Sequence, residues 1–343
     1  MKRIAITLSV LTLGVAAVAM PAGVSAWGNT GHRLIGVAAM RALPDELPAF
    51  LRTPGAVAEV GELSREPDRT KGGGQPHDRE RDTAHFVDMD DEARVMSAAG
   101  PSIDALPVLK SQYDAALAAA GIDVDDAGYL PYAIMDGYQQ LVRDFATWRV
   151  LNAAEARETD PGKRAWYRED RLRREALILR DMGYLAHYVG DGAQPHHTSI
   201  HYNGWSRDVP NPDGFTTSRQ THSLFEGAFT ARVARLDRVE LAMAAPRLDG
   251  FDLRARVPAY LKTTLAEVRP FYVLEKAGGF REIDARGGAF ANARLAAGAG
   301  ELRDLIILAW RDSADDSIGW PTVKVAEVEA GTADPWLSMI GED

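Results

Sequence analysis

Residues 172–197 read LRREALILRDMGYLAHYVGDGAQPHH, and this stretch decides the expected fold. Its apolar residues recur every three or four positions, which is typical of an amphipathic α-helix and not of the alternation seen in strands. The pattern predicts a helix over residues 172–190. Gly192 and Pro195 predict that this helix ends shortly after Asp191, so that the chain can then turn back towards it.

The same helical period extends over most of the chain. It predicts further helices over residues 106–120, 132–154, 219–233, 260–271 and 289–311. No window shows the alternating pattern of a strand between turn signals. The loops are polar and contain glycine and proline, notably residues 69–82 and 203–218. Without an internal repeat or a low-complexity linker, the sequence predicts an all-α fold, with one mainly helical domain over residues 27–343 and long loops.

The first 26 residues have the pattern of a secretory signal peptide. A basic pair at positions 2–3 precedes an apolar run over residues 4–19, and residues 24–26 (VSA) fit a small-residue cleavage site. We expect cleavage between Ala26 and Trp27 and export to the periplasm or the medium. An uncleaved N-terminal anchor is the alternative. No second hydrophobic span follows, so we expect no transmembrane segment in the mature chain.

Composition narrows the class of protein further. The chain of 343 residues has no cysteine, so an exported form must depend on its core or on bound metal ions. It carries 39 basic and 49 acidic residues, a formal net charge of −10. This balance argues against a broad basic surface for duplex DNA. It does not exclude a small polyanion site at which metal ions supply the positive charge.

Histidines stand at helical spacing from carboxylates in two places. His187 and Asp191 are four residues apart, and so are His222 and Glu226. Four residues advance a helix by about 400°, so each pair lies on one face. Such a pair can hold a metal ion, although the same spacing also occurs in ordinary surface pairs.

Other possible ligands lie along the chain, and together they suggest a cluster of metal ions. Imidazole and carboxylate ligands without a thiolate make zinc the natural candidate. The set comprises His32, Asp68, His85, His187, Asp191, His197, His222 and Glu226. These are too many ligands for one tetrahedral zinc, and they suit a cluster with bridging carboxylates.

The order of these residues resembles the zinc-dependent family that includes fungal and plant single-strand-specific nucleases and bacterial phospholipases C. The motifs that carry the resemblance are WGNTGH at 27–32, Asp68 before a loop, HFVD at 85–88, HYVGDGAQPHH at 187–197 and HSLFE at 222–226. The resemblance covers residues 27 to about 230. The rest of the chain is similar only in being helical.

The resemblance implies three zinc ions. The first would be held by Asp68, His85, His187 and Asp191, and the second by His197, His222 and Glu226. The third would be held by His32 and by the terminal amine and carbonyl oxygen of Trp27, with Asp191 bridging it to the first. Because the Trp27 nitrogen is an amide before signal cleavage, and an amide is a poor ligand, export would be coupled to activation.

The implied activity is hydrolysis of a phosphodiester. Two bridged zinc ions roughly 3.5–4 Å apart lower the pKa of a shared water, and the resulting hydroxide would attack phosphorus. The remaining zinc would stabilise the leaving oxygen. By the same resemblance, Asp68 is the catalytic residue that orients or deprotonates the nucleophile. Arg69 or Lys71 would contact the phosphate or would simply be solvated loop cations.

The substrate is predicted to be single-stranded DNA or RNA. The short spacing between Trp27 and His32 resembles that of the nucleases. In those nucleases, the residue that corresponds to Phe86 stacks on a base, and the residue that corresponds to Asp88 hydrogen-bonds to it. Stacking is worth about 1–3 kcal/mol per base. Packing of Phe86 in the core is the alternative.

Other features favour other functions. Glu226 in place of an aspartate, and the absence of the nucleases' Gly-Gly-Asn stretch, point to phospholipase C as the alternative enzyme. An exported zinc-binding protein without catalysis is the second alternative. Asn203 and Trp205 could line a substrate groove or pack at the surface. His77, His196 and His201 receive no role, and no stable protein partner is predicted.

Overall fold

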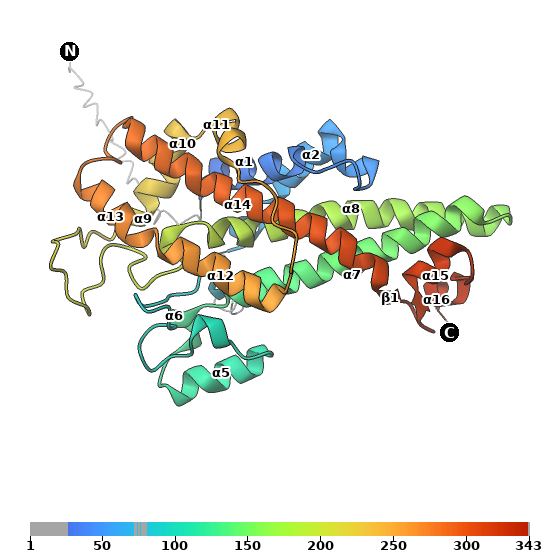
Figure 1. Ribbon diagram of the computed structural model, residues 1–343, viewed down its shortest axis with the longest axis horizontal. Helices are drawn as coiled ribbons and strands as arrows, with labels where there is room; N and C mark the ends of the chain where they lie inside the picture. The colour runs from blue at the N-terminus through green and yellow to red at the C-terminus, as the bar shows by residue number, and fades with distance from the viewer. Residues whose placement is uncertain (1–26, 72–73, 75, 77–80, 342–343) are drawn as a thin grey trace, which may run out of the picture.

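The computed structural model describes residues 27–71, 74, 76 and 81–341. The signal peptide expected over residues 1–26, and His77, lie outside these residues. The described chain is mainly helical with one two-stranded sheet, so the prediction of an all-α fold is confirmed (Figure 1).

Two long helices, α7 (Leu130–Arg157) and α8 (Pro161–Gly192), run side by side along the molecule (Figure 1). The start of α8 is set by Asp160, whose side chain accepts hydrogen bonds from the backbone nitrogens of Gly162 and Lys163. The helix therefore begins well before the expected residue 172. Charged contacts hold its first half to α7, including an ion pair of 2.7 Å between Arg174 and Asp144.

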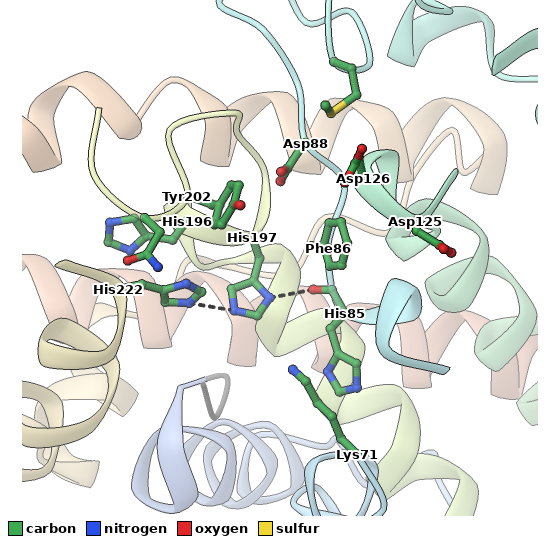
Figure 2. A pocket seen from close by; sticks show the side chains of 12 residues that line it. Lys71, His85, Phe86, Asp88, Asp125, Asp126, His196, His197, Tyr202 and His222 are labelled. Atoms are coloured by element: carbon green, nitrogen blue, oxygen red, sulfur yellow. Dashed lines mark hydrogen bonds between the residues drawn. The ribbon is translucent and has the colours of Figure 1, made fainter. Parts of the chain in front are cut away.

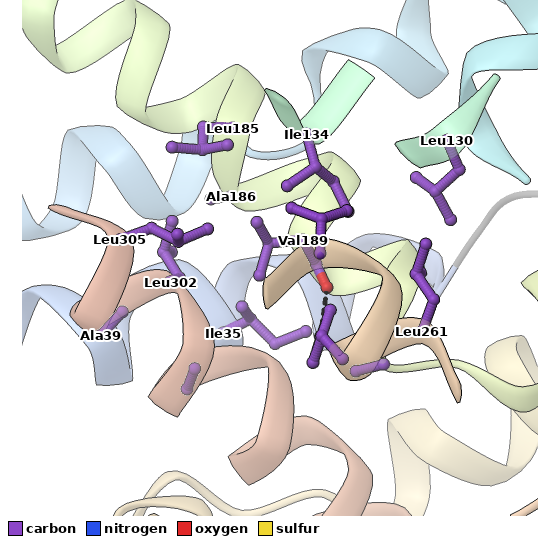
Figure 3. Packing of buried hydrophobic residues seen from close by; sticks show 14 of the residues in the cluster. Ile35, Ala39, Leu130, Ile134, Leu185, Ala186, Val189, Leu261, Leu302 and Leu305 are labelled. Carbon is purple, nitrogen blue, oxygen red and sulfur yellow. Dashed lines mark hydrogen bonds between the residues drawn. The ribbon is translucent and has the colours of Figure 1, made fainter. Parts of the chain in front are cut away.

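Helices α1 (Gly28–Arg41), α2 (Pro54–Leu63) and α14 (Ala285–Asp312) pack against the second half of α8. Ile35 and Ala39 of α1 meet Leu302 and Leu305 of α14 in the core, beside apolar side chains of α7, α8 and α12 (Figure 3). A Cβ atom at Gly183 of α8 would overlap Leu63. Glycine thus allows the end of α2 to approach α8 closely. The short helices η1 (Ala49–Arg52) and α3 (Glu66–Arg69) flank α2.

Residues 81–129 form a layer of short elements to one side of α7 (Figure 1). These are η2 (Thr83–His85), η3 (Ile103–Ala105), α5 (Lys110–Ala119) and α6 (Val124–Ala127). Helix α5 begins four residues later than the expected residue 106, because residues 106–109 are not helical and Val108 and Leu109 are exposed.

Two expected helices after α8 are divided in the structure. Residues 219–233 form α9 (Thr221–Ser223), the π-helix η5 (Leu224–Phe229) and α10 (Thr230–Val233). Residues 260–271 fall in α12 (Leu253–Leu265) and α13 (Val268–Lys276). Between α8 and α9 come η4 (Pro195–His197) and a long loop, and α11 (Leu236–Ala242) follows α10. The chain does turn back after Gly192, as Pro195 predicted.

The C-terminal elements are small and pack against the ends of α7 and α8. They are η6 (Ser313–Asp315), β1 (Ser317–Ile318), β2 (Val323–Lys324), α15 (Val325–Ala330) and α16 (Trp336–Ile340). Strands β1 and β2 pair antiparallel, with Ile318 opposite Val323. Within the described part of the chain, every helix is too short or too polar to span a bilayer.

Candidate metal centre

Three groups of histidine and carboxylate side chains could each hold a metal ion. In each group, one ligand atom per residue lies within 4.8 Å of the others. The groups are His85, His187 and Asp191; His197, His222 and Glu226; and His32, Asp68 and His187. All eight side-chain ligands expected from the sequence therefore come together, although they belong to segments far apart in the chain.

The first group lies where the end of α8 meets η2. Nδ1 of His85 lies 2.9 Å from Nε2 of His187. Oδ2 of Asp191 lies 3.1 Å from the His85 nitrogen and 3.2 Å from that of His187. A tetrahedral zinc with bonds of about 2.0–2.1 Å holds two nitrogen ligands about 3.3 Å apart. The spacing of these three atoms is close to what a shared cation requires.

A backbone hydrogen bond determines the tautomer of His187. Its Nδ1 atom donates to the carbonyl oxygen of Ser64, at 2.8 Å. A carbonyl oxygen can only accept, so the proton is on Nδ1 and Nε2 presents a lone pair to the group. This is the usual arrangement of a metal-binding histidine.

The second group repeats the same arrangement. Nδ1 of His197 donates to the carbonyl oxygen of His85 at 2.6 Å, which leaves Nε2 with a lone pair. That Nε2 atom lies 3.1 Å from Nε2 of His222 (Figure 2). Oε1 of Glu226 lies 3.0 Å from Nε2 of His197 and 2.7 Å from Nε2 of His222. Glu226 also accepts a hydrogen bond from the buried side chain of Gln194, which holds it in place.

The helix that carries His222 and Glu226 is not regular. A π-helix over Leu224–Phe229 follows a single turn of α-helix. Such wide turns are uncommon and often occur at functional sites. His222 and Glu226 therefore face each other as expected, but the helix that carries them is distorted.

The third group connects α1 to the other two. The His32 ring is buried, and neither of its ring nitrogens has a hydrogen-bond partner among the described residues. Its Nε2 atom lies 3.5 Å from Oδ1 of Asp191, whereas Oδ2 of Asp191 faces His85 and His187. The two oxygens of Asp191 thus face different groups, as a bridging carboxylate requires. Oδ1 of Asp68 lies 3.9 Å from both the His85 and the His187 nitrogens.

Trp27 lies buried beside these groups. Its indole nitrogen donates to the carbonyl oxygen of Gly190 at 2.7 Å, and its own carbonyl oxygen accepts from the backbone nitrogen of Gly31. The next residue, Gly28, packs against the backbone of Glu226. The start of α1 therefore lies between the end of α8 and η5. Metal binding by the Trp27 amine and carbonyl oxygen stays a prediction.

Neighbouring histidines keep the two buried carboxyls of the site ionised. Burial alone would raise the pKa of the Asp191 carboxyl, but His187 and His197 outweigh it and hold that pKa well below its ordinary value. For Glu226, His222 and His197 likewise outweigh burial and lower the pKa. Both carboxyls are therefore ionised at neutral pH although both are buried. Buried charges of this kind are paired or coordinate metals.

Two of the three groups open onto a cavity of about 320 Å³. His85, His197 and His222 contribute to its lining, and Phe86 stands between His85 and Asp88 (Figure 2). Phe86 is half-buried, so its ring is not simply part of the core. Asp88 is buried, and its Oδ1 atom has no hydrogen-bond partner among the described residues. Lys71 lines the cavity, whereas the Arg69 guanidinium is paired with Glu66.

Sequence reasoning missed several residues of this region. Gln194 positions Glu226, and His196 packs on the His222 ring, with centroids 5.0 Å apart. The remaining side chains that line the cavity are Met96, Asp125, Asp126, Tyr202 and Asn203. Only Asn203 was considered from the sequence. The others carry no local signal, because they reach the cavity through tertiary folding.

Comparison of the chain with protein-family models, with curated proteins and with solved structures finds no match.

Proposed function

We propose that this chain is an exported zinc-dependent phosphodiesterase that cleaves single-stranded nucleic acid. The observation that carries the proposal is that two ligand groups, those of His85 and of His197 with His222, open onto one cavity. Asp191 of the first of these groups also faces His32. Purely structural zinc sites are closed by four protein ligands, whereas catalytic sites leave a position for water or substrate. The exposure of His85, His197 and His222 to the cavity favours catalysis over simple metal storage.

The ligand set fits zinc. It contains imidazoles with defined tautomers and ionised carboxylates and no thiolate, and zinc accepts this set. We assign three ions. Asp68, His85, His187 and Asp191 would hold the first, since the one lone pair of His187 serves a single ion. His197, His222 and Glu226 would hold the second, and His32 with the Trp27 backbone and Asp191 the third. When bound, the zinc ions would activate water and neutralise negative charge on the phosphate.

The chain's own residues have separate tasks in this proposal. Asp68 stands at the edge of the first group, 3.9 Å from two of its nitrogens, where its carboxylate can orient the attacking water and accept a proton. Lys71 lines the same cavity and can pair with a phosphate oxygen. Ser64 and His85 hold the ligand rings by their carbonyl oxygens.

The rest of the cavity suits a nucleobase. The ring of Phe86 offers a stacking surface, and the carboxyl of Asp88 can hydrogen-bond to the edge of a base. Stacking requires an unpaired base, which is why we assign a single strand as the substrate.

Phospholipase C activity is the second candidate, because the same cavity has features that suit a cationic head group. The aromatic rings of Phe86 and Tyr202 and the carboxyls of Asp88 and Asp126 line it together. Aromatic faces and carboxylates bind quaternary ammonium groups well.

One experiment separates the candidates. Purified protein of measured zinc content is offered single-stranded DNA, RNA and phosphatidylcholine vesicles in parallel, with Asp68→Asn as the matched inactive variant. We expect the wild type to cleave the nucleic acids and the variant to lose at least 100-fold in kcat. Release of diacylglycerol without nucleic-acid cleavage would reverse the ranking. No turnover of any of the three, with zinc present, would contradict the proposal.

A further inference from the structure

A second cavity continues from the one at the metal groups. It has a volume of about 570 Å³ and shares four lining residues with the first. The shared residues are Asp88, Met96, Tyr202 and Asn203. In Figure 2, Lys71 and His85 lie at one end of the first cavity, and Asp88 and Tyr202 lie at the other. The second cavity therefore adjoins the end that is remote from Lys71.

Two arginines distinguish this second cavity. Arg207 and Arg219 both line it, and both are exposed. Neither forms an ion pair with any residue that the structure describes, although many other arginines of the chain do. The exposed Asp208 is the acidic residue that lines this cavity beyond the shared Asp88. In a chain of net charge −10, two such arginines at a cavity suit an anionic ligand.

Ring stacking and hydrogen bonds hold the loop that precedes and includes Arg207 in a fixed position. The Trp205 ring stacks on His201 with centroids 3.7 Å apart, and the Ser206 backbone nitrogen donates to Nδ1 of His201 at 3.0 Å. The Trp205 backbone nitrogen donates to the carbonyl oxygen of Thr216. The Tyr272 hydroxyl anchors His201 itself, by donating to its carbonyl oxygen. The backbone at Arg207 is thus held near the cavity before a ligand arrives.

Arg219 of the second cavity lies near Tyr202, which lines both cavities. Burial raises the pKa of the Tyr202 hydroxyl, and the positive charge of Arg219 is among the effects that oppose this rise. Tyr202 lines both cavities, so Arg219 acts on the wall that they share. Arg219 also precedes His222 by three residues, which connects this wall to the second metal group.

We infer that the second cavity is a subsite for another phosphate of the same substrate strand, bound by Arg207 and Arg219. The inference rests on the proposed function and narrows its substrate class to polyphosphodiesters. The substrate lies across both cavities, with one phosphate at the metal groups, a base against Phe86, and a further phosphate at the arginines. Guanidinium groups suit this role, because they bind phosphate oxygens in pairs. A phospholipid that carries one phosphodiester does not use both positions.

The test compares two double variants that remove the same charge. Arg207→Gln with Arg219→Gln alters the second cavity. Arg164→Gln with Arg168→Gln alters two exposed arginines of α8 that likewise have no ion pair with a described residue. Position 168 is 19 helical residues, or about 28 Å, from His187. Binding of a fluorescent single-stranded oligonucleotide to the zinc-loaded proteins is measured by anisotropy at several salt concentrations.

We expect the cavity variant to bind the oligonucleotide roughly 5- to 20-fold more weakly and the α8 variant to bind like the wild type. The plot of log Kd against log salt concentration should become shallower by about 0.7 for each lost phosphate contact. Equal losses in both variants, no loss in the cavity variant, or no binding by the wild type would overturn the subsite. Turnover of bis(4-nitrophenyl) phosphate is measured separately. Its absence in the wild type would count against the proposed function, whereas the binding data alone decide the subsite.

Discussion

The imidazole of His32 lies flat on that of His187, with ring centroids 3.9 Å apart and planes 17° apart. Both rings are fully buried, and two protonated imidazoles could not be stacked there without strong repulsion. Burial, with the nearby His187, lowers the pKa of His32 well below its ordinary value, in keeping with a neutral ring. The contact joins α1 to α8 through two rings that both face Asp191.

Removal of metal should therefore weaken the fold as well as the activity. Metal ions that bind the folded chain stabilise it relative to the unfolded chain, and they neutralise the buried carboxylates of Asp191 and Glu226. We expect chelation to abolish turnover and to lower the melting temperature by several degrees, and zinc to restore both. Calorimetry with elemental analysis checks this. An unchanged melting curve after verified loss of metal would show that the metal ions do not support the fold.

Asp191→Asn should affect more than one metal ion. The substitution keeps the size of the side chain and removes the charge of a carboxylate whose two oxygens face separate groups. We expect a loss of more than one zinc per chain and at least a 100-fold loss of turnover. Asp170→Asn, in the exposed half of α8, is the control and should keep both. Full zinc content in Asp191→Asn would rule out a bridging role.

Phe86→Ala should weaken binding of oligonucleotides. A stacking contact of about 1–3 kcal/mol corresponds to a roughly 5- to 150-fold rise in KM for single strands, with a much smaller effect on a small phosphodiester. Phe50→Ala, a half-buried ring against Trp148, is the control for general effects on packing. A large loss of stability without a selective rise in KM would show that Phe86 serves the core instead.

A free amine at Trp27 should be needed for the full set of metal ions. A protein that begins Met-Trp27, with the methionine retained, carries an amide at the Trp27 nitrogen. An amide nitrogen is a poor metal ligand, so this nitrogen can no longer complete the set at His32. We expect the loss of about one zinc per chain and a sharp fall in activity, both reversed when a protease exposes Trp27. Equal zinc content and activity in the two forms would argue against chelation by the terminus.

A carboxyl remote from the metal groups makes a separate prediction about pH. Asp144 of α7 is buried and accepts hydrogen bonds from Arg174 and Gln140. Burial, with a hydrogen bond to Asp181, raises its pKa from 3.8 to about 7. Between these values the folded protein holds a proton that the unfolded chain releases, so this group makes the folded state less stable as the pH rises.

Asp144→Asn should remove this dependence. The amide can still accept from Arg174 and can donate to Asp181, and it has no proton to lose. We expect the variant to gain stability over the wild type as the pH rises from 5 to 8, by about 1–3 kcal/mol at pH 8. Urea unfolding at each pH measures the difference, with Asp170→Asn, a partly exposed carboxyl paired with Arg173, as the control. A constant difference across this range would contradict the raised pKa.

The sequence predicted the class of fold, and it also predicted the residues that come together in the candidate metal centre, for reasons that are partly local. His187 and Asp191 lie on one face of α8, and the helix ends before Pro195, so that His197 returns to the same region. These relationships depend on helical spacing and on a strong turn signal. Both can be recognised in a short stretch of sequence. The start of α8 at Pro161 was missed, because its first half is held by the Asp160 cap and by ion pairs such as Arg171 with Glu155 instead of by an apolar stripe.

The long-range parts of the site could not be predicted from the sequence. Gln194 contacts Glu226 only because η5 packs beside η4, and Arg207 and Arg219 approach the cleft only because the loop at residues 203–218 folds back on His201. The π-helix was missed for a similar reason. Its sequence has ordinary helical spacing, and packing of the surrounding helices decides the wider turn.

The acceptors that set the tautomers of His187 and His197 are the carbonyl oxygens of Ser64 and His85, which are main-chain atoms. Every amino acid supplies such an oxygen, so no replacement of the Ser64 side chain can delete the acceptor itself. Substitution of Ser64 therefore leaves the hydrogen bond to the His187 ring in place. A substitution at Gly183 would disturb this hydrogen bond instead. Any side chain there would push α2 away from α8, and the Ser64 carbonyl at the end of α2 would move with it.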